Sequence, residues 1–182
     1  MKMKNPWKKL SSKVVHKNSF YYVRKDQIIR PDGTPGTYHA IVSPDSVFTV
    51  ALDSKMRVCL VGQVRYLTGL YSLELPGGGS ERQNPLAAAK RELWEETGLK
   101  AKKWAKLGTF WPCNGMLAEK SHIFLATGLE QTKQNKQLED GIDRNIWIPM
   151  RKIMQMIKTG KITDGEAIAG LTLAALKLKI KF

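Results

Sequence analysis

Long apolar runs and clustered cysteines are both missing from this 182-residue sequence. Its longest apolar stretches, such as residues 47–52, are far too short to span a bilayer. The N-terminus is basic but has no apolar stretch of the signal-peptide kind. The two cysteines, Cys59 and Cys113, stand far apart, which favours reduced thiols over a disulfide framework or a zinc site. We therefore expect a cytoplasmic protein without a membrane segment.

Acidic residues are also scarce: 16 Asp and Glu stand against 30 Lys and Arg, and the net charge is +14. Such a charge favours polyanionic partners, including nucleic acid, nucleotides and anionic surfaces. Many of the lysines lie in the first 30 residues and in the tail LKLKIKF, and they form no single stripe with interleaved aromatic residues. Nucleic acid is therefore the less favoured partner, whereas a phosphate-rich substrate of any size agrees with the charge.

The remaining pattern predicts a mixed fold. Residues 1–45 are rich in Lys and Tyr, are broken by RPDGTPG, and predict short strands around a turn. The later chain predicts a hairpin, further strands and two helices. In order, these segments are residues 46–53, 57–66, 71–75, 102–111 and 121–129, a short strand ending at Trp147, residues 149–160 and a last helix from near Asp164. We expect an α/β or α+β fold, with a mixed β-sheet sandwiched between helices over residues 46–182 and residues 1–45 as a β-rich extension.

One more helix is predicted in the segment GGGSERQNPLAAAKRELWEETGL, residues 77–99. Asn84 is a good N-cap, Pro85 suits the first helical position, and Gly98 suits the C-terminal stop, so the helix is expected over residues 85–97. At 3.6 residues per turn, one face turns toward the core. That face carries Leu86, Ala89, Leu93 and Thr97.

Three glutamates of this helix, Glu92, Glu95 and Glu96, fall within one arc of about 100° beside the core face. Like charges so close repel one another unless a cation lies among them. Hard divalent cations such as Mg²⁺ are held by a few carboxylates together with substrate phosphates. A solvated acidic face is the alternative for an arbitrary glutamate cluster. Here the Gly-rich loop ahead of the helix, which can bring backbone groups close to a phosphate, favours the metal site.

The same segment resembles the Nudix box, whose pattern is G-x5-E-x7-R-E-U-x-E-E-x-G-U, with U an aliphatic residue. The matching residues are Gly77, Arg91, Glu92, Leu93, Glu95, Glu96, Gly98 and Leu99. The resemblance implies a Nudix fold and Mg²⁺-dependent hydrolysis of a nucleoside diphosphate linked to another group, with Mn²⁺ as a possible substitute. It implies that Glu95 and Glu96 ligate the metal, with Glu92 as a further ligand or a base. A backbone carbonyl group around Gly77 or Gly78 completes the coordination.

One position departs from the box, because Gln83 stands where the family has Glu. In the family, that Glu pairs with the box Arg and helps to shape the metal site. Gln83 could accept a hydrogen bond from Arg91, but it carries no charge. Glu81 is close enough in sequence to substitute. We expect weaker metal binding at worst.

Beyond the box, residues 20–180 are similar to the ADP-ribose pyrophosphatase and nucleoside-diphosphate-sugar hydrolase branch of the family. The similar stretches are VGQVRY, LELPGG, LGTFWPCNG, IWIP and MIKTGKITDGEAIA. The resemblance implies that Arg65 contacts substrate phosphates and that Glu74 lies beside the metals. It also implies that Phe20, Tyr21 and Tyr22 stack on the base. Taken alone, these residues equally suit a surface charge and half-buried strand packing.

The general base is placed by the same resemblance on an acidic loop, where Glu139 takes its position. The family's next acidic position falls on Gly141, which is a departure. Asp140 is the reserve candidate and Glu92 the second reserve. The alternative is that QLEDGID is only a solvated loop.

The sequence narrows the substrate range less than it narrows the reaction. ADP-ribose hydrolases carry Pro where this chain has Asn114, and Pro112 lies two residues earlier. Asn114 is therefore a candidate substrate contact, and GDP-mannose and related nucleotide sugars stay open as substrates beside ADP-ribose.

The branch also implies a homodimer in which residues 1–45 cross to the partner. Two rival functions remain: an RNA 5′-pyrophosphohydrolase or decapping enzyme, which the charge supports, and a non-catalytic nucleotide-sugar sensor, which Gln83 and Gly141 support.

Overall fold

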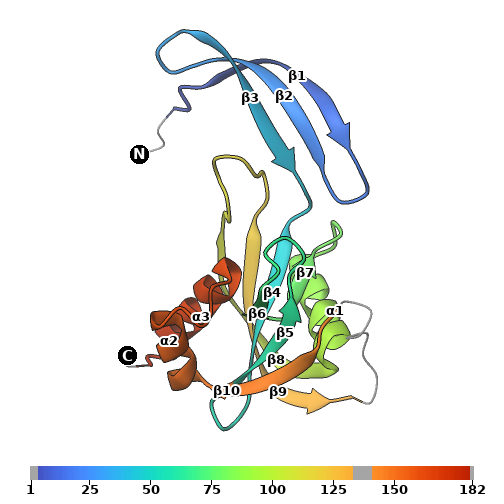
Figure 1. Cartoon of the computed structure of the whole chain (residues 1–182), viewed down its shortest axis with the longest axis vertical. Coiled ribbons are helices and arrows are strands. Elements are labelled where there is room, and N and C mark those ends of the chain that lie inside the picture. The colour runs from blue at the N-terminus through green and yellow to red at the C-terminus, as the bar shows by residue number, and fades with distance from the viewer. Residues whose placement is uncertain (1–3, 133–140, 181–182) are drawn as a thin grey trace. The chain divides into compact units, whose positions relative to one another are not determined.

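The computed structural model describes residues 4–132 and 141–180, which divide into two units (Figure 1). The N-terminal unit comprises Met1–Pro44 and Trp111–Glu119, and the main unit comprises Asp45–Phe110 and Lys120–Phe182. No helix in the described ranges is both long and apolar enough to cross a membrane.

The two thiols of the described residues are free, as predicted, with Cys59 buried and Cys113 exposed. Burial raises the pKa of Cys59 to about 12, so its thiol is protonated at neutral pH.

The described part of the N-terminal unit contains an antiparallel sheet with strand order β1-β2-β3. Its strands are β1 (Lys8–Lys17), β2 (Tyr22–Ile29) and β3 (Pro35–Val42). Asn18 fixes the β1–β2 turn, because its side chain accepts hydrogen bonds from the backbone N–H groups of Phe20 and Tyr21, both at 2.8 Å. The predicted strands around a turn are thus present, with β1 as an additional strand that the sequence reasoning did not define.

The loop of residues 111–119 belongs to this unit as well. Ile41 on β3 donates its backbone N–H to Met116 at 2.9 Å and accepts a hydrogen bond from Ala118 at 2.8 Å. The sequence predicted this loop only as a connection between two strands. Long-range backbone pairing with β3 decides its placement instead, and no local pattern reports such pairing.

The main unit is built on a mixed sheet, which is seven-stranded in the described residues and has the order β10-β5-β4-β9-β8, with β6 beside β5 and β7 beside β4. The pair β4–β9 is parallel and the other pairs are antiparallel. The strands are β4 (Ser46–Leu52), β5 (Arg57–Val64), β6 (Tyr71–Glu74), β7 (Gly77–Gly79), β8 (Leu99–Phe110), β9 (Ser121–Gln131) and β10 (Arg144–Pro149). The helices are α1 (Pro85–Thr97), α2 (Met150–Lys158) and α3 (Gly165–Lys177).

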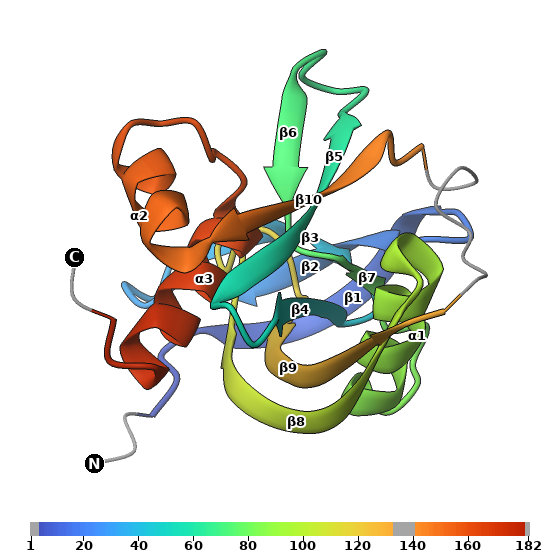
Figure 2. The same ribbon diagram turned by 90° about the horizontal axis from the view of Figure 1, so that it is seen from below.

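Side-chain alternation along β4 sends its residues to the two opposite faces of the sheet. Val50 packs in the core that includes residues of α2 and α3, whereas Val47 and Ala51 pack in the cores that include residues of α1. Helices therefore cover both faces of the sheet, with α1 on one side and α2 and α3 on the other (Figure 2). This confirms the predicted mixed sheet sandwiched between helices.

Candidate functional site

The helix α1 has the predicted bounds and caps. The Asn84 side chain accepts hydrogen bonds from the backbone N–H groups of Leu86, at 3.0 Å, and Ala87, at 3.4 Å. Pro85 occupies the first turn, where a missing N–H costs nothing. Gly98 ends the helix with φ of 70°, and its N–H donates to the Trp94 carbonyl group at 2.8 Å. These local signals fix where the three glutamates stand.

The core face of α1 also matches the prediction, with one addition. Ala89, Leu93 and Thr97 are buried, and Leu86 is half-buried. Glu96 is buried too, with an exposed fraction of only 7%. A carboxylate at this depth needs polar partners, because burial without them is costly.

The strand β7 supplies one such partner. The backbone N–H of Gly77 donates to Oε2 of Glu96 at 2.7 Å. Gly77 is pressed so closely against β4 that an added Cβ would overlap the Val47 carbonyl oxygen and lie 2.6 Å from Cδ1 of Phe48. A Cβ on Gly78 would lie 3.0 Å from the carboxyl carbon of Glu92. The glycines therefore let the backbone approach both the sheet and the carboxylates.

Arg91 is a cation among the carboxylates. Its Nη2 lies 2.8 Å from Oε1 of Glu92, and its Nη1 lies 2.7 Å from Oε2 of Glu95. Arg91 and Glu95 stand four residues apart, which is the spacing at which such a pair forms on a helix. Nη2 also donates to the Gly79 carbonyl oxygen at 3.0 Å and lies 3.8 Å from Oε1 of Glu81. Arg91 thereby ties α1 to the Gly-rich strand.

At the departure from the box, another carboxylate of the same loop lies near Arg91. Gln83 is exposed, and its backbone N–H donates to the Ser80 carbonyl group at 2.8 Å. Glu81 is the acidic residue of this loop that lies near Arg91, at 3.8 Å, and it adopts a left-handed φ of 50°. The predicted substitution of Glu81 for the missing glutamate agrees with this position, although its carboxylate is exposed and its contact with Arg91 is long.

The donor set suits a hard divalent cation, because every candidate ligand is an oxygen: the carboxylates of Glu92, Glu95 and Glu96 and the carbonyl group of Gly77. Within residues 4–132 and 141–180, no group of three or more acidic, His or Cys side chains is placed to hold a metal ion by itself. This arrangement fits a cation such as Mg²⁺, for which substrate phosphates complete a site of one or two carboxylates.

Arg65 and Glu74, both predicted for the site, form an ion pair. Nε of Arg65 donates to Oε1 of Glu74 at 2.9 Å, and Nη2 donates to Oε2. Glu74 is buried, with an exposed fraction of 4%, and also accepts a hydrogen bond from Gln63 at 3.3 Å. The hydrogen bond from Arg65 to Glu74 raises the pKa of Arg65, and the charges of Asp164 and Glu96 act in the same direction.

Asp164 is a carboxylate that sequence reasoning placed only at a helix start. Its Oδ1 accepts a hydrogen bond from the backbone N–H of Ala167 at 2.7 Å and so caps α3. Burial, together with the charges of Glu74 and Glu166, raises its pKa to about 6. No local sequence signal reports this environment, because Glu74 lies on another element.

The N-terminal unit holds the other predicted substrate contacts, in two places. Phe20 and Tyr21 are exposed at the β1–β2 turn, with Phe20 at 78%, and Tyr22 is half-buried at the start of β2. None of the three lines the cavity described for this unit, whereas Asn114 does. Of the predicted substrate contacts in this unit, only Asn114 therefore lines the described cavity.

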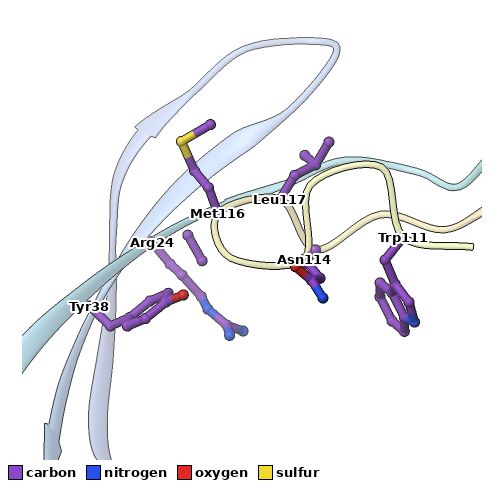
Figure 3. A pocket seen from close by; sticks show the side chains of 8 residues that line it. Arg24, Tyr38, Trp111, Asn114, Met116 and Leu117 are labelled. Atoms are coloured by element: carbon purple, nitrogen blue, oxygen red, sulfur yellow. The ribbon is translucent and has the colours of Figure 1, made fainter. Parts of the chain in front are cut away.

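That cavity has a volume of about 330 Å³. It is lined by Arg24, Tyr38, Ala40, Trp111, Asn114, Met116, Leu117 and Ala118. Figure 3 shows Arg24, Asn114 and Trp111 on the same side of the 111–119 loop. The Tyr38 hydroxyl group donates to the Gly115 carbonyl oxygen, which fastens the loop to β3. Sequence reasoning missed Arg24, Tyr38 and Trp111, although the aromatic residue in WPCNG was a visible signal.

The base candidates Glu139 and Asp140 lie outside the described residues. Gly141, where the family has an acidic residue, has φ of 72°, a left-handed conformation that glycine adopts without strain. Glu92, the remaining candidate, lies in the ion pair with Arg91.

Two family patterns match the sequence. The pattern described as NUDIX domain covers residues 42–171. The pattern described as nucleoside diphosphate sugar hydrolase N-terminal domain covers residues 7–41. The first spans most of the chain, and the second spans the strands β1 to β3.

Two curated relatives align over most of their length. The CMP-5′-(N-acetyl-N-hydroxy-3-aminopropyl)phosphonate hydrolase of Streptomyces rubellomurinus is 28% identical over 93% of this chain and 83% of the relative. The ADP-ribose pyrophosphatase of Mycobacterium tuberculosis is 30% identical over 89% of this chain and 80% of the relative. A solved structure described as an ADP compounds hydrolase has a TM-score of 0.84 at 18% identity, over 98% of this chain and 97% of that one.

Proposed function

This chain belongs to the Nudix family, and we propose on that premise that it hydrolyses the diphosphate linkage of nucleoside diphosphate sugars to a nucleoside monophosphate and a sugar phosphate. The observation that carries the proposal is the contact set of α1. Arg91 joins Glu92, Glu95 and the Gly79 carbonyl group, and Gly77 holds Glu96. The match of residues 7–41 to the N-terminal domain of nucleoside diphosphate sugar hydrolases points to the substrate class.

The metal ion is proposed to be Mg²⁺, with Mn²⁺ as a substitute. Glu95 and Glu96 would hold it, with Glu92 and the Gly77 carbonyl group as further ligands. Bound there, the ion would neutralise the diphosphate and activate a water molecule. Arg91 pairs with both Glu92 and Glu95 and restrains their orientation, and Arg65 supplies a guanidinium group for a substrate phosphate.

Glu139 is proposed as the general base, and Glu92 as the alternative. Glu139→Gln is expected to slow hydrolysis by roughly two to four orders of magnitude while substrate binding persists, because only proton removal from water is lost. Glu92→Gln is the matched variant, and single-turnover rates with separately measured substrate affinity provide the comparison. An unchanged rate in Glu139→Gln would move the role to Asp140 or Glu92.

Recognition of the nucleoside is assigned to the N-terminal unit. Trp111, Arg24 and Asn114 line one cavity and offer an aromatic ring, a cation and an amide group, which suits a nucleotide. The names of the two relatives contain different nucleosides and different attached groups, which favours a substrate range wider than ADP-ribose. GDP-mannose therefore belongs among the candidate substrates.

Trp111→Ala is expected to raise KM about tenfold with little change in kcat, since stacking on one base contributes about 1–3 kcal/mol. Phe20→Ala is the matched variant, because Phe20 is the most exposed of the three aromatic residues that the sequence had assigned to stacking. Steady-state kinetics on ADP-ribose and GDP-mannose measure both variants. A rise in KM for Phe20→Ala alone would return the base contact to the β1–β2 turn.

A homodimer through residues 1–45 is also proposed. The whole of β1 is exposed, and it carries large apolar side chains at Leu10, Val14 and Val15. The described sheet of this unit has only three strands, and the apolar side chains of β1 are exposed to solvent. Such a sheet is well suited to pairing with a second copy. The N-terminal unit would then complete the site of the partner.

The function is tested by release of nucleoside monophosphate in Mg²⁺ from ADP-ribose, GDP-mannose, a nucleoside triphosphate and 5′-triphosphate RNA. Turnover of the diphosphate sugars is the expected result. Turnover of RNA alone would overturn the proposal in favour of a 5′-pyrophosphohydrolase, a function that the net charge of +14 also supports. Tight binding of diphosphate sugars without turnover in either Mg²⁺ or Mn²⁺ would overturn it in favour of a sensor.

A further inference from the structure

Arg24 contacts a buried carboxylate and also lines the cavity of the N-terminal unit. Its Nε is buried and lies 3.1 Å from Oδ2 of Asp26, an ion-pair distance without hydrogen-bond alignment. In the described ranges, neither Nη1 nor Nη2 of Arg24 donates to another residue. The side chain is 34% exposed, whereas that of Asp26 is 6% exposed. The guanidinium group is therefore restrained at Nε and keeps both Nη atoms for a ligand.

Asp26 is held in turn by Ser12 on β1. The Ser12 hydroxyl group donates to Oδ1 of Asp26 at 2.5 Å, and the two residues are register partners in the β1–β2 pair. Because side chains alternate between the two faces of a strand, Arg24 and Asp26, two residues apart on β2, lie on the same face. One carboxylate oxygen thus contacts Ser12 and the other contacts Arg24, so two strands together fix the position of Nε.

Stabilisation of the sheet is the alternative role for this ion pair. Replacing a buried ion pair with apolar residues of similar volume is often neutral or stabilising, so stability alone explains such a pair poorly. What the pair does supply is a fixed orientation of the guanidinium group. That group lines a cavity to which Trp111 and Asn114 also contribute (Figure 3). The restraint on Arg24 therefore bears on what the cavity binds.

The two Nη atoms can only donate, because a guanidinium group has no acceptor. Guanine presents two adjacent acceptors, N7 and O6, and an arginine can donate to both at once. Adenine presents N7 beside its N6 amino group, which is itself a donor, so the same pair of hydrogen bonds cannot form. The amide group of Asn114 carries a donor and an acceptor, which suits adenine. The cavity can thus hold either purine, and Arg24 favours guanine.

We propose that Arg24 selects the base, with a preference for guanine over adenine, and that Asp26 and Ser12 position it. The proposal rests on the proposed function, which assigns the nucleoside to this cavity. A phosphate group also offers adjacent acceptors to a guanidinium group. The aromatic ring of Trp111 in the same cavity favours the base, because bases stack on such rings.

The test compares GMP with AMP in equilibrium binding by calorimetry, and GDP-mannose with ADP-mannose in steady-state turnover. The two members of each pair differ only in the base. The wild-type chain is expected to bind GMP about tenfold more tightly than AMP, which lies within the discrimination of one bidentate contact. Arg24→Gln is expected to lose this preference. Its KM for GDP-mannose is expected to rise about tenfold, while kcat stays within about twofold for both substrates.

Two further variants test the positioning of Arg24. Asp26→Asn keeps an acceptor for Ser12 but removes the charge that attracts Arg24. It is expected to raise KM for GDP-mannose by about two- to fivefold, the range for a part-exposed ion pair, with KM for ADP-mannose unchanged. Ser12→Ala removes only the hydroxyl group and is expected to cause a smaller change in the same direction. It keeps the carboxylate, so it tests the same restraint even if Asp26→Asn disturbs the fold.

Lys25→Gln is the matched control for loss of positive charge. Lys25 follows Arg24 on β2, its side chain lies on the other face of the strand, and it does not line the cavity. The preference for GMP is expected to be unchanged in this variant.

Equal affinities for GMP and AMP in the wild type, or an Arg24→Gln variant that keeps the preference, would overturn the proposal. So would an equal loss of affinity for both nucleotides in Arg24→Gln, which would assign Arg24 to a phosphate group. Because this binding is measured without turnover, the two proposals can fail separately. A silent substrate panel together with a preference for GMP that Arg24→Gln removes would reject the proposed hydrolysis and support the selection of the base by Arg24.

Discussion

Replacing Glu95 and Glu96 together with Gln is expected to reduce metal-dependent release of nucleoside monophosphate by at least about a hundredfold. The double substitution removes two negative charges from the α1 arc while keeping side chains of nearly the same shape. After Glu96→Gln, the amide oxygen of the new side chain can still accept the hydrogen bond from Gly77, and Arg91 keeps its ion pair with Glu92. The fold is therefore expected to persist while affinity for the cation falls.

The measurement is hydrolysis of ADP-ribose across a range of Mg²⁺ concentrations, with calorimetry of Mg²⁺ binding alongside it. Glu96→Gln alone is expected to lose most of the activity, because Glu96 is the most deeply buried of the three carboxylates. Glu130→Gln is a suitable control, since Glu130 forms an exposed pair with Lys102 and such pairs contribute little. Near-normal rates in the double variant, with the control unchanged, would contradict the metal assignment.

Local chemistry made α1 the most predictable element. Asn84, Pro85 and Gly98 act within one turn of the helix ends, so the sequence alone locates them. The arc of glutamates followed from helical periodicity. The ion pairs from Arg91 to Glu92 and Glu95 also lie within one turn of the helix. The contacts of a site on a single helix join residues that are close together in the sequence. Most of such a site can therefore be predicted from the sequence.

Contacts between distant segments were the parts that sequence reasoning missed. The strand β1 is exposed at every residue, so it shows no alternation of buried and exposed side chains. The 111–119 loop joins the N-terminal unit through backbone pairing with Ile41. The raised pKa of Asp164 arises from burial and from Glu74 on β6. The pairing of Arg65 with Glu74 was not predicted, because its geometry depends on the register of β5 and β6.

Gly77→Ala is expected to destabilise the main unit and to remove activity together. The new methyl group would overlap the Val47 carbonyl oxygen and crowd Cδ1 of Phe48, both of which belong to the central strand β4. Relief requires β7 to move away from β4, and overpacking of this kind costs about 3 kcal/mol. The same movement would withdraw the Gly77 N–H from Glu96 and displace the backbone carbonyl group proposed as a metal ligand. We expect a fall in Tm of about 6–12 °C and a loss of turnover of more than about tenfold well below Tm.

Gly79→Ala is the matched control, because Gly79 lies on the same strand but a Cβ there meets no heavy atom within 4 Å. Its free energy of unfolding is expected to stay within about 0.5 kcal/mol of the wild type. Both variants are compared by thermal unfolding and by ADP-ribose hydrolysis. The comparison separates the loss of stability and activity caused by any added methyl group on β7 from the effect specific to position 77. If Gly77→Ala matched Gly79→Ala in both measurements, the close packing of β7 on β4 would not be what holds Glu96 in place. A loss of both stability and turnover in Gly77→Ala alone would mean that one glycine couples the sheet to the carboxylates, since its missing side chain admits β4 on one side and its N–H binds Glu96 on the other.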